Sequence, residues 1–465
     1  MTGPGLAMPR VDFGRDVLPP SRLVRGACPS MAAPMQTGDG LLVRLRPSAP
    51  GLTVSQLRQL ALAAARHGNG LIEITARGNL QLRGLSWATM PPLEADIARA
   101  GIVPDTGLAI ETPPLSGTDP KEIADARALA ARLRQAIARL PTPLTLAPKL
   151  SIIVDGSARL SLDTVTADIR LMAVSTSDAR PQWLVAVGGT RGTAAAVSVG
   201  SDESGLNAVV DLLRSLNALG PRARGRDLAL ALRQDASAGV AGPSRPAGYA
   251  ALRPSKAHVG IHDLERNGVA LGLQPAFGQI HATDLIAFLA VAESHGISEF
   301  RTAPDHTLLL LGASPQAMAK VQAAAAKSGF WTDADEPARH IAACSGAGGC
   351  ASGTYHTKKL AADVVGWVPG LLDGSVVLHL SGCPKGCAHP GESAIAVVGL
   401  ATGLGIVVRG KASSPPVLFV DENGLRSGLQ RLAQLVGITK AAGESVQQCL
   451  TRLGSDVISA ALRQE

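Results

Sequence analysis

The feature that most constrains this chain is a repeat within its sequence. Residues 269–330 align with residues 41–102 without a gap at an offset of 228 positions. Each copy shows the order strand, helix, strand, helix in its pattern of apolar residues. The matched pairs include Pro47 with Pro275, Leu57 with Leu285, His67-Gly68 with His295-Gly296, Leu80 with Leu308, Leu82 with Leu310, Gly84 with Gly312, and Gly101 with Gly329. An ungapped match with the same periods predicts a duplicated α+β half-domain.

Within the first copy, the strand LLVRLRP precedes an amphipathic helix. The helix is predicted over residues 53–67, with Thr53 as its N-terminal cap and Gly68 just past its end. A second helix is predicted within PPLEADIARAG, residues 91–101.

Between these two helices, residues 73–85 (EITARGNLQLRGL) alternate apolar and polar side chains, which predicts a strand. Its polar face would carry Arg77, Asn79, Gln81 and Arg83. A solvated strand is the alternative, but Asn and Gln are poor strand formers. In the second copy the equivalent residues are Asp305, Thr307, Leu309 and Leu311. Because only the first copy keeps a row of fork-shaped donors, we interpret the row as a surface that binds carboxylates.

The repeat divides the chain into further segments. Residues 236–254 are rich in Gly, Pro and Ser and read as a linker. We expect a tail over 1–21, a first half-domain over 22–102, an α/β domain over 103–235, the linker over 236–254, a second half-domain over 255–333, and a last domain over 334–465 that contains the clustered cysteines and two closing helices.

Composition narrows the class of partner. The formal charge is +7 and the isoelectric point is near 9.3, but aromatic residues make up only 3% of the chain. With few aromatic side chains to stack on bases and no Lys/Arg run, a nucleic-acid partner is not favoured, and a small anionic substrate fits the charge. No apolar stretch reaches the length of a membrane span and the first residues lack a signal-peptide core, so we expect a cytoplasmic protein with no membrane partner.

Four of the six cysteines are clustered in the sequence. Five residues separate Cys344 from Cys350, and three separate Cys383 from Cys387, all among Gly, Ser and Pro. Disulfides are not expected in a reducing compartment, and four thiolates in turn-rich segments are typical of a [4Fe–4S] cluster. A structural zinc site, whose pairs are usually closer, and unligated buried cysteines are the alternatives.

Other candidate residues near the cysteines are read as ordinary. Cys28 and Cys449 stand alone, and a structural role for His379 and His389 is favoured over a role as iron ligands. The glycine-rich stretches do not follow the strand-to-helix phosphate pattern, so electrons are expected to come from another protein.

The duplicated half-domain, the ARGNLQLRG stretch and the C-x5-C and C-x3-C pairs together resemble the nitrite/sulfite reductase superfamily. The resemblance covers roughly residues 22–400. It implies an α+β fold of duplicated ferredoxin-like half-domains with two larger α/β domains of the sirohaem and iron–sulfur type. It also implies that Cys344, Cys350, Cys383 and Cys387 hold a [4Fe–4S] cluster. The tetrapyrrole carboxylates would be bound by Arg77, Asn79, Gln81 and Arg83, helped by Arg44, Arg46 and Lys149.

Two departures from this superfamily concern the site for a small anion. Sulfite and nitrite reductases carry two lysines in an R-K-x-K strand, whereas APKLSII keeps Lys149 and has Ser151 at the second position. They also carry an arginine in the loop after the first half-domain, and GLAIETPPLSG has none. A pocket without those charges is poorly suited to drawing an oxyanion onto haem iron.

The N-terminal stretch RGACPSMAAPMQTGDGLLVRLRP is similar to one branch of the superfamily, the monooxygenases of aerobic cobalamin biosynthesis. For that branch the resemblance implies a [4Fe–4S] cluster, a further non-haem iron, and dioxygen as the oxidant. Its tetrapyrrole substrate, precorrin-3A, is hydroxylated at C20 and a γ-lactone forms from the ring A acetate. An electron donor protein or an NAD(P)H-dependent reductase would supply electrons.

Two other functions are weighed against this one. The first is a sirohaem-dependent sulfite or nitrite reductase with an altered anion site. The second is a tetrapyrrole-binding or electron-carrier protein, which is disfavoured because a carrier does not need both a cluster and a carboxylate-binding face. The sequence identifies neither the catalytic residues nor the ligands of a second iron.

Overall fold

The computed structural model describes residues 29–175, 180–237 and 257–463. The predicted tail and Cys28 lie outside these residues, as does most of the predicted linker. The chain divides into two compact units, one of residues 29–36 and 40–334 and one of residues 37–39 and 335–463. Each unit is described by itself below.

The first half-domain follows the predicted order of strands and helices. Its main helix, α1, begins after Thr53, whose side chain accepts from the backbone of Gln56 in a capping box, and ends at Gly68. The predicted helix over 53–67 is therefore confirmed. The elements are β1 (Met35–Thr37), β2 (Gly40–Leu45), β3 (Leu52–Thr53), α1 (Val54–His67), β4 (Leu71–Ile74), β5 (Leu80–Leu85) and α2 (Met90–Arg99).

The second half-domain repeats this plan. Its helix α6 begins at Ala282, the position that corresponds to Val54 at the start of α1. The elements are β11 (Gly260–Asp263), β12 (Val269–Pro275), β13 (Gln279–His281), α6 (Ala282–Ser294), β14 (Glu299–Ala303), β15 (Thr307–Leu311), α7 (Pro315–Lys327) and β16 (Phe330–Trp331). Short 3₁₀ turns occupy Glu265–Asn267 and Ala276–Gly278.

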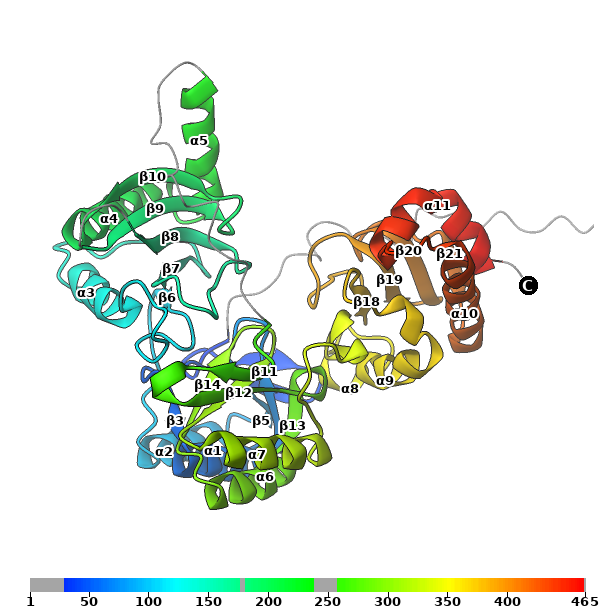
Figure 1. Cartoon of the computed structure of the whole chain (residues 1–465), viewed down its shortest axis with the longest axis horizontal. Helices are drawn as coiled ribbons and strands as arrows, with labels where there is room; N and C mark the ends of the chain where they lie inside the picture. The colour runs from blue at the N-terminus through cyan, green and yellow to red at the C-terminus, as the bar shows by residue number, and fades with distance from the viewer. Residues whose placement is uncertain (1–28, 176–179, 238–256, 464–465) are drawn as a thin grey trace, which may run out of the picture. The chain divides into compact units, whose positions relative to one another are not determined.

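The two half-domains exchange strands. Strand β13 of the second copy pairs with β4 of the first, while β3 of the first copy pairs with β14 of the second. The resulting sheets have the orders β1-β2-β5-β4-β13 and β11-β12-β15-β14-β3. Figure 1 shows α1, α2, α6 and α7 gathered beneath these strands. A single hydrophobic core contains buried residues of both copies, so the half-domains form one body.

The first α/β domain is a five-stranded sheet with helices. Strands β6, β7 and β8 are parallel, and β9 and β10 continue the sheet antiparallel, in the order β10-β9-β8-β7-β6. Its core packs residues of α3 and α4 against the strands around Trp183. The elements are β6 (Ala109–Glu111), α3 (Ala126–Ala138), β7 (Ser151–Asp155), β8 (Ala167–Val174), β9 (Gln182–Gly189), β10 (Ala195–Gly200), α4 (Asp202–Leu219) and α5 (Gly225–Ser237).

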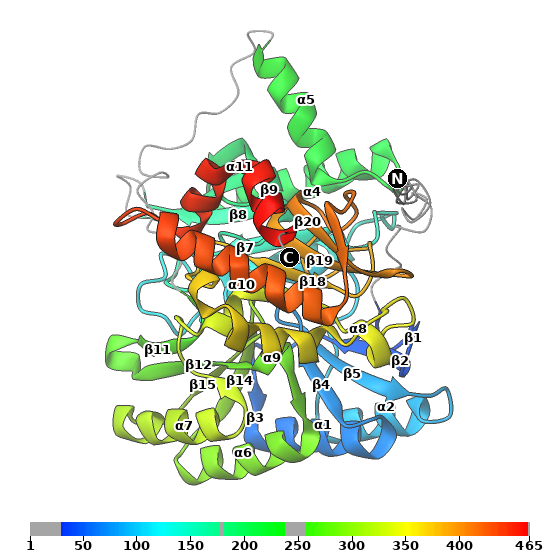
Figure 2. The same cartoon turned by 90° about the vertical axis from the view of Figure 1, so that its right-hand side faces the viewer.

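The second unit contains a sheet with the same topology as that of the first α/β domain. Strands β17, β18 and β19 are parallel and β20 and β21 continue antiparallel, in the order β17-β18-β19-β20-β21. The elements are β17 (Ile341–Ala343), α8 (Gly346–Gly349), α9 (Thr357–Trp367), β18 (Leu378–Ser381), β19 (Ser393–Leu400), β20 (Gly403–Gly410), β21 (Leu418–Val420), α10 (Glu422–Thr439) and α11 (Val446–Arg463), with 3₁₀ turns at Pro337–His340 and Pro369–Leu371. In each α/β domain two helices follow the last strand, as Figures 1 and 2 show. The duplication therefore extends to the α/β domains.

Residues 73–85 do not form one strand, so that prediction is wrong. Strand β4 ends at Ile74 and β5 begins at Leu80. Between them the N–H of Thr75 donates to the carbonyl of Asn79 at 2.9 Å, closing a hairpin turn. Gly78 has φ of 76°, the left-handed conformation that this turn requires. Arg77 and Asn79 therefore lie in the turn, and only Gln81 and Arg83 lie on the strand.

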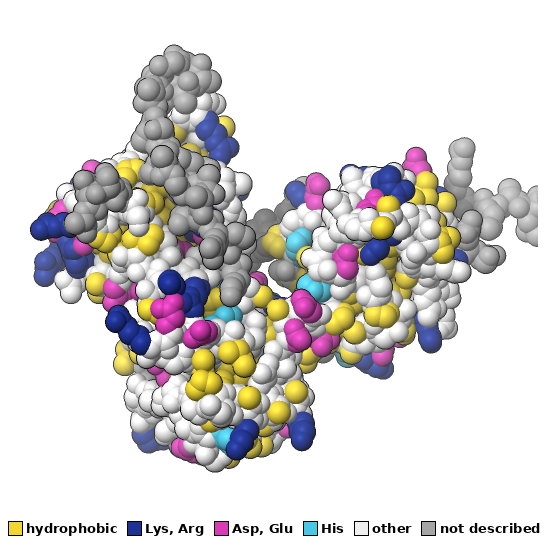
Figure 3. All heavy atoms as spheres, in the orientation of Figure 1, with side chains coloured by type: hydrophobic (Ala, Val, Ile, Leu, Met, Phe, Trp, Pro, Cys, Tyr) yellow, Lys and Arg dark blue, Asp and Glu magenta, His cyan; other side chains and the backbone are white. Residues whose placement is uncertain are grey.

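Two further observations concern membrane-spanning helices and the charge of the surface. Among the described residues, no helix combines the length and the apolar character needed to span a bilayer. Figure 3 shows Lys and Arg side chains intermixed with Asp and Glu side chains on the visible face of each unit.

Candidate functional site

The clustered cysteines lie where the parallel strands of the second unit end. Cys344 follows directly after β17, and Cys383 follows shortly after β18. Cys350 lies just past α8, and Cys387 lies in the segment between β18 and β19. Loops at the carboxyl ends of parallel strands are the usual place for a ligand in an α/β sheet.

Three of the four clustered thiols lie close enough to the fourth, that of Cys383, to raise its pKa. Burial raises the pKa of the Cys383 thiol, and the neighbouring Cys387, Cys350 and Cys344 raise it further. The pKa of Tyr355 is also raised, first by burial and then by Cys344 and Cys383. Mutual repulsion of this kind is relieved when thiolates share a positively charged metal centre.

Backbone packing shapes the loops around these sulfurs. The N–H of Gly382 donates to Sγ of Cys344 at 3.2 Å. A side chain at Gly382 would place its Cβ 3.1 Å from Cα of Gly353, and one at Gly346 would lie 2.7 Å from the backbone nitrogen of Thr357. A Cβ at Gly346, whose φ is 63°, would overlap the backbone, and a Cβ at Gly382 would require a neighbour to shift, so these glycines let the loops approach closely.

Four thiols among glycines are the donor set that a [4Fe–4S] cluster requires. Among the described residues, no three His, Cys, Asp or Glu side chains already stand in the arrangement of ligands to one metal ion. The assignment of Cys344, Cys350, Cys383 and Cys387 as cluster ligands stays a prediction. Cys449 is buried with Thr439 Oγ1 3.6 Å from its sulfur, as an ordinary core residue would be.

The two histidines near the second pair contact each other. The rings of His379 and His389 meet edge to face, with 5.7 Å between their centroids. His379 is completely buried, and Nε2 of His389 lies 3.1 Å from the carbonyl oxygen of Glu392. The structural role expected for the two histidines stays a prediction.

Two of the residues expected to bind carboxylates contact one internal carboxylate, and a third contacts one of those two. Arg83 and Gln81 contact the same oxygen of Glu73, at 3.2 and 2.7 Å. Arg44 donates to the amide oxygen of Gln81 at 2.6 Å, and Gln279 of the second half-domain donates to the other oxygen of Glu73. Glu73, which lies on the same face of the hairpin, was not among the residues expected from the sequence.

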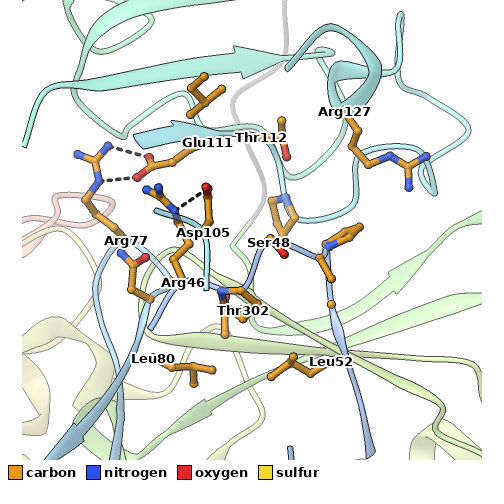
Figure 4. A pocket seen from close by; sticks show the side chains of 18 of the residues that line it. Arg46, Ser48, Leu52, Arg77, Leu80, Asp105, Glu111, Thr112, Arg127 and Thr302 are labelled. Carbon is orange, nitrogen blue, oxygen red and sulfur yellow. Dashed lines mark hydrogen bonds and ion pairs between the residues drawn. The ribbon is translucent and has the colours of Figure 1, made fainter. Parts of the chain in front are cut away.

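Arg77 and Arg46 have carboxylate partners of their own. The guanidinium of Arg77 contacts both oxygens of Glu111, at 3.2 and 2.7 Å, and donates to the carbonyl of Thr166. Arg46 donates from Nε to Asp105 at 3.0 Å. Figure 4 shows both pairs, with dashed lines, in a cavity that Asn79 also lines.

Lys149 differs from the other expected residues. It is exposed, and its backbone adopts a positive φ of 67°. Its carbonyl accepts a hydrogen bond from Arg224, and its side chain is not part of the lining of the cavity. A role for Lys149 in binding tetrapyrrole carboxylates stays a prediction.

The packing of the second half-domain explains why it has no row of polar side chains like that of the first. Leu309 and Leu311, which replace Gln81 and Arg83, are buried in a cluster with Leu115 and Leu160 of the first α/β domain. This face of the second copy is covered by the chain itself, so apolar side chains are favoured there. The first copy carries polar side chains at these positions and the second carries leucines because the second copy packs against the first α/β domain there.

Comparisons with known proteins identify the family. The model of the nitrite/sulfite reductase ferredoxin-like half domain matches residues 33–100 and again residues 262–328, which confirms the duplication. A precorrin-3B synthase of a Sinorhizobium species is 47% identical over 446 residues, 95% of this chain and 95% of the relative.

More distant relatives agree with this result. A ferredoxin–nitrite reductase of Synechococcus elongatus is 25% identical over 395 residues, covering 78% of this chain and 77% of its own. The structure of the Mycobacterium tuberculosis NirA protein superposes with a TM-score of 0.66 at 17% identity, over 91% of this chain and 85% of that one. The expected fold class is confirmed. The chain belongs to the precorrin-3B synthase family of the nitrite/sulfite reductase superfamily.

Proposed function

We propose that this protein is an O2-dependent monooxygenase that converts precorrin-3A to precorrin-3B in aerobic cobalamin biosynthesis. One atom of dioxygen would hydroxylate C20, with closure of a γ-lactone by the ring A acetate, and the other would leave as water with two electrons from a donor. The observation that carries this proposal is the identity of 47% with a precorrin-3B synthase over 95% of both chains.

The cysteine loops support the cofactor that this reaction needs. We assign Cys344, Cys350, Cys383 and Cys387 as ligands of a [4Fe–4S] cluster, which would supply one-electron transfer when bound. A further non-haem iron is part of the proposal, without assigned ligands. The electrons would come from an external donor protein or an NAD(P)H-dependent reductase, and the four free thiols suit the reducing cytoplasm.

The donors of the first half-domain support binding of a ring with many carboxylates. Gln81 and Arg83 already bind a carboxylate in this structure, that of Glu73, and Arg44 donates to the amide oxygen of Gln81. Fork-shaped donors are matched to such groups in geometry and charge. In this proposal these residues orient the macrocycle, and no residue of the chain is assigned as an acid or base.

A sirohaem-dependent sulfite or nitrite reductase remains the second candidate because reductases of that kind are relatives of this chain. Two observations count against it. Ser151 stands where those reductases carry a second lysine, and its hydroxyl lies 3.3 Å from Nη2 of Arg77. The loop that lacks their arginine places Glu111 against Arg77 instead, which adds negative charge where an oxyanion would need positive charge.

Labelled dioxygen tests the proposal directly. The anaerobically purified enzyme, given precorrin-3A, an electron donor and labelled dioxygen, should form product that contains one labelled oxygen atom by mass spectrometry. With a strong artificial donor it should reduce sulfite and nitrite negligibly, even after sirohaem is offered. Unlabelled product together with rapid sulfite reduction would show that the second candidate is correct.

A further inference from the structure

A cavity of about 300 Å³ lies inside the larger unit, between the first half-domain and the first α/β domain. The loop of residues 46–51, the turn that contains Arg77, strand β6 and helix α3 all contribute to its walls. Figure 4 shows side chains that line the cavity, Arg46, Arg77 and Arg127 among them. Its volume is at the small end of the range for ligand sites, enough for one arm of a larger molecule.

Four arginines line this cavity, and two of them are matched by carboxylates of the chain. Arg77 contacts both oxygens of Glu111. Arg127 contacts both oxygens of Asp125, at 3.1 and 2.9 Å. In each pair one edge of the guanidinium faces one carboxylate, so the two charges are balanced.

The other two arginines share a single carboxylate. Arg46 donates to Asp105 Oδ2 at 3.0 Å, and Nη2 of Arg134 lies 3.6 Å from the same oxygen. Arg134 comes from α3, and its Nη2 donates to the carbonyl of Ile110 at 2.8 Å. Within the described part of the chain, both Nη groups of Arg46 have no hydrogen-bond partner. Around Asp105, two guanidiniums therefore share one carboxylate, and this group of three side chains carries one positive charge in excess.

We propose that Arg134 and Arg46 together bind one carboxylate arm of the tetrapyrrole, an inference that rests on the proposed function. A carboxylate carries the single negative charge that balances Arg46, Arg134 and Asp105 taken together, and it accepts hydrogen bonds from two guanidiniums at once. Asp105 holds the two like-charged groups close together before the ligand arrives. A doubly charged phosphate is less suitable, because Asp105 and Glu111 lie in the same cavity.

Arg134 was not among the residues expected from the sequence, because it lies outside the motifs of the superfamily. Its neighbour Arg132 on α3 provides a matched control. Arg132 forms ion pairs with Asp202 and Glu203 of α4, and it does not line the cavity. Substitution of either residue removes one charge from the same helix.

Titration of the holoenzyme with uroporphyrin, a porphyrin that carries only carboxylate side chains, tests the inference by porphyrin fluorescence. Arg134→Ala should weaken binding by about tenfold or more, since loss of a hydrogen bond to a charged group is worth about 1.5–3 kcal/mol. Arg132→Ala should bind like the wild type. Arg134→Lys keeps the positive charge but lacks the paired N–H donors of a guanidinium, so it should bind with intermediate affinity. It also provides a second variant if Arg134→Ala does not fold.

The outcomes separate this inference from the proposed function. Wild-type protein that binds neither uroporphyrin nor precorrin-3A would remove the proposed function. Wild-type protein that binds, with equal affinities for the Arg134 and Arg132 variants, would overturn the role of Arg134 and leave the proposed function standing. Equal weakening of both variants would assign the effect to net charge and would also overturn the inference.

Discussion

Cys383 illustrates how burial and neighbouring charge act together at the scale of a residue. Its thiol is 9% exposed, and burial together with three nearby cysteines raises its pKa. A thiol in this position is expected to stay protonated until a metal centre takes the place of the proton. Such a residue contributes more to binding a cluster than to stability without one.

Replacement of the cysteines tests their assignment. Cys344→Ser and Cys383→Ser should each lose most of the iron and acid-labile sulfide, because a serine hydroxyl is a much weaker ligand for iron than a thiolate. Cys449→Ser is the control, since Cys449 lies on α11, far along the chain from the clustered cysteines, and contacts Thr439 of α10. Iron and sulfide analysis of the anaerobically purified variants is the measurement. Equal iron in all three variants would contradict the cluster assignment.

The arginines expected to bind carboxylates are visible in the sequence, but the carboxylates that contact them in the structure are not. Arg77 and Arg83 belong to a recognisable row and Arg44 to the preceding strand, and the structure places each beside a polar partner. Asp105 is 59 residues from Arg46 and belongs to no motif, so only the fold brings the two together. The same holds for Arg134. Partners far apart in sequence cannot be read from a local pattern.

At the scale of an element, local signals were sufficient for α1 but not for the β4–β5 hairpin. The cap at Thr53 and the end at Gly68 are set by neighbouring residues, so the helix was predicted correctly. In the hairpin, alternation of polar and apolar residues continues through the turn, which hides it. Gly78, whose φ is 76°, was the signal that should have divided the segment into two strands.

The turn should be sensitive to any side chain at Gly78. A Cβ there would lie 2.8 Å from the backbone carbonyl carbon of Ala303, in addition to the cost of a positive φ. We expect Gly78→Ala to lower the free energy of unfolding by about 1–2 kcal/mol from the backbone conformation and a further amount of about 1–3 kcal/mol from the overlap.

Gly296→Ala separates these two contributions. Gly296 also has a positive φ, of 85°, but a Cβ built there has no atom within 4 Å. Chemical denaturation should therefore show a smaller loss for Gly296→Ala than for Gly78→Ala. If both variants lose the same stability, the close approach of the two hairpins has no energetic role.

At the scale of the whole molecule, the two α/β domains share one plan but use its loops differently. In the first domain, the segments that follow β6 and β7 contain Leu115 and Leu160, which pack against the second half-domain. In the second domain, the segments that follow β17 and β18 contain the clustered cysteines. The sequence showed the repeat only in the half-domains, because in the α/β domains it is the order of elements that the two copies share.

The exchange of strands makes the chain comparable to a domain-swapped dimer whose two subunits have been joined covalently. Each half-domain completes its sheet with a strand from the other, β13 in one direction and β3 in the other, around one shared core. Cleavage at a protease site inserted after Gly248 should therefore yield two fragments that elute together in size-exclusion chromatography and separate only in denaturant. Fragments that separate in native buffer would mean that the peptide connection, rather than the shared core, holds the halves together. If the fragments stay together, the peptide connection serves mainly to raise the effective concentration of one half for the other.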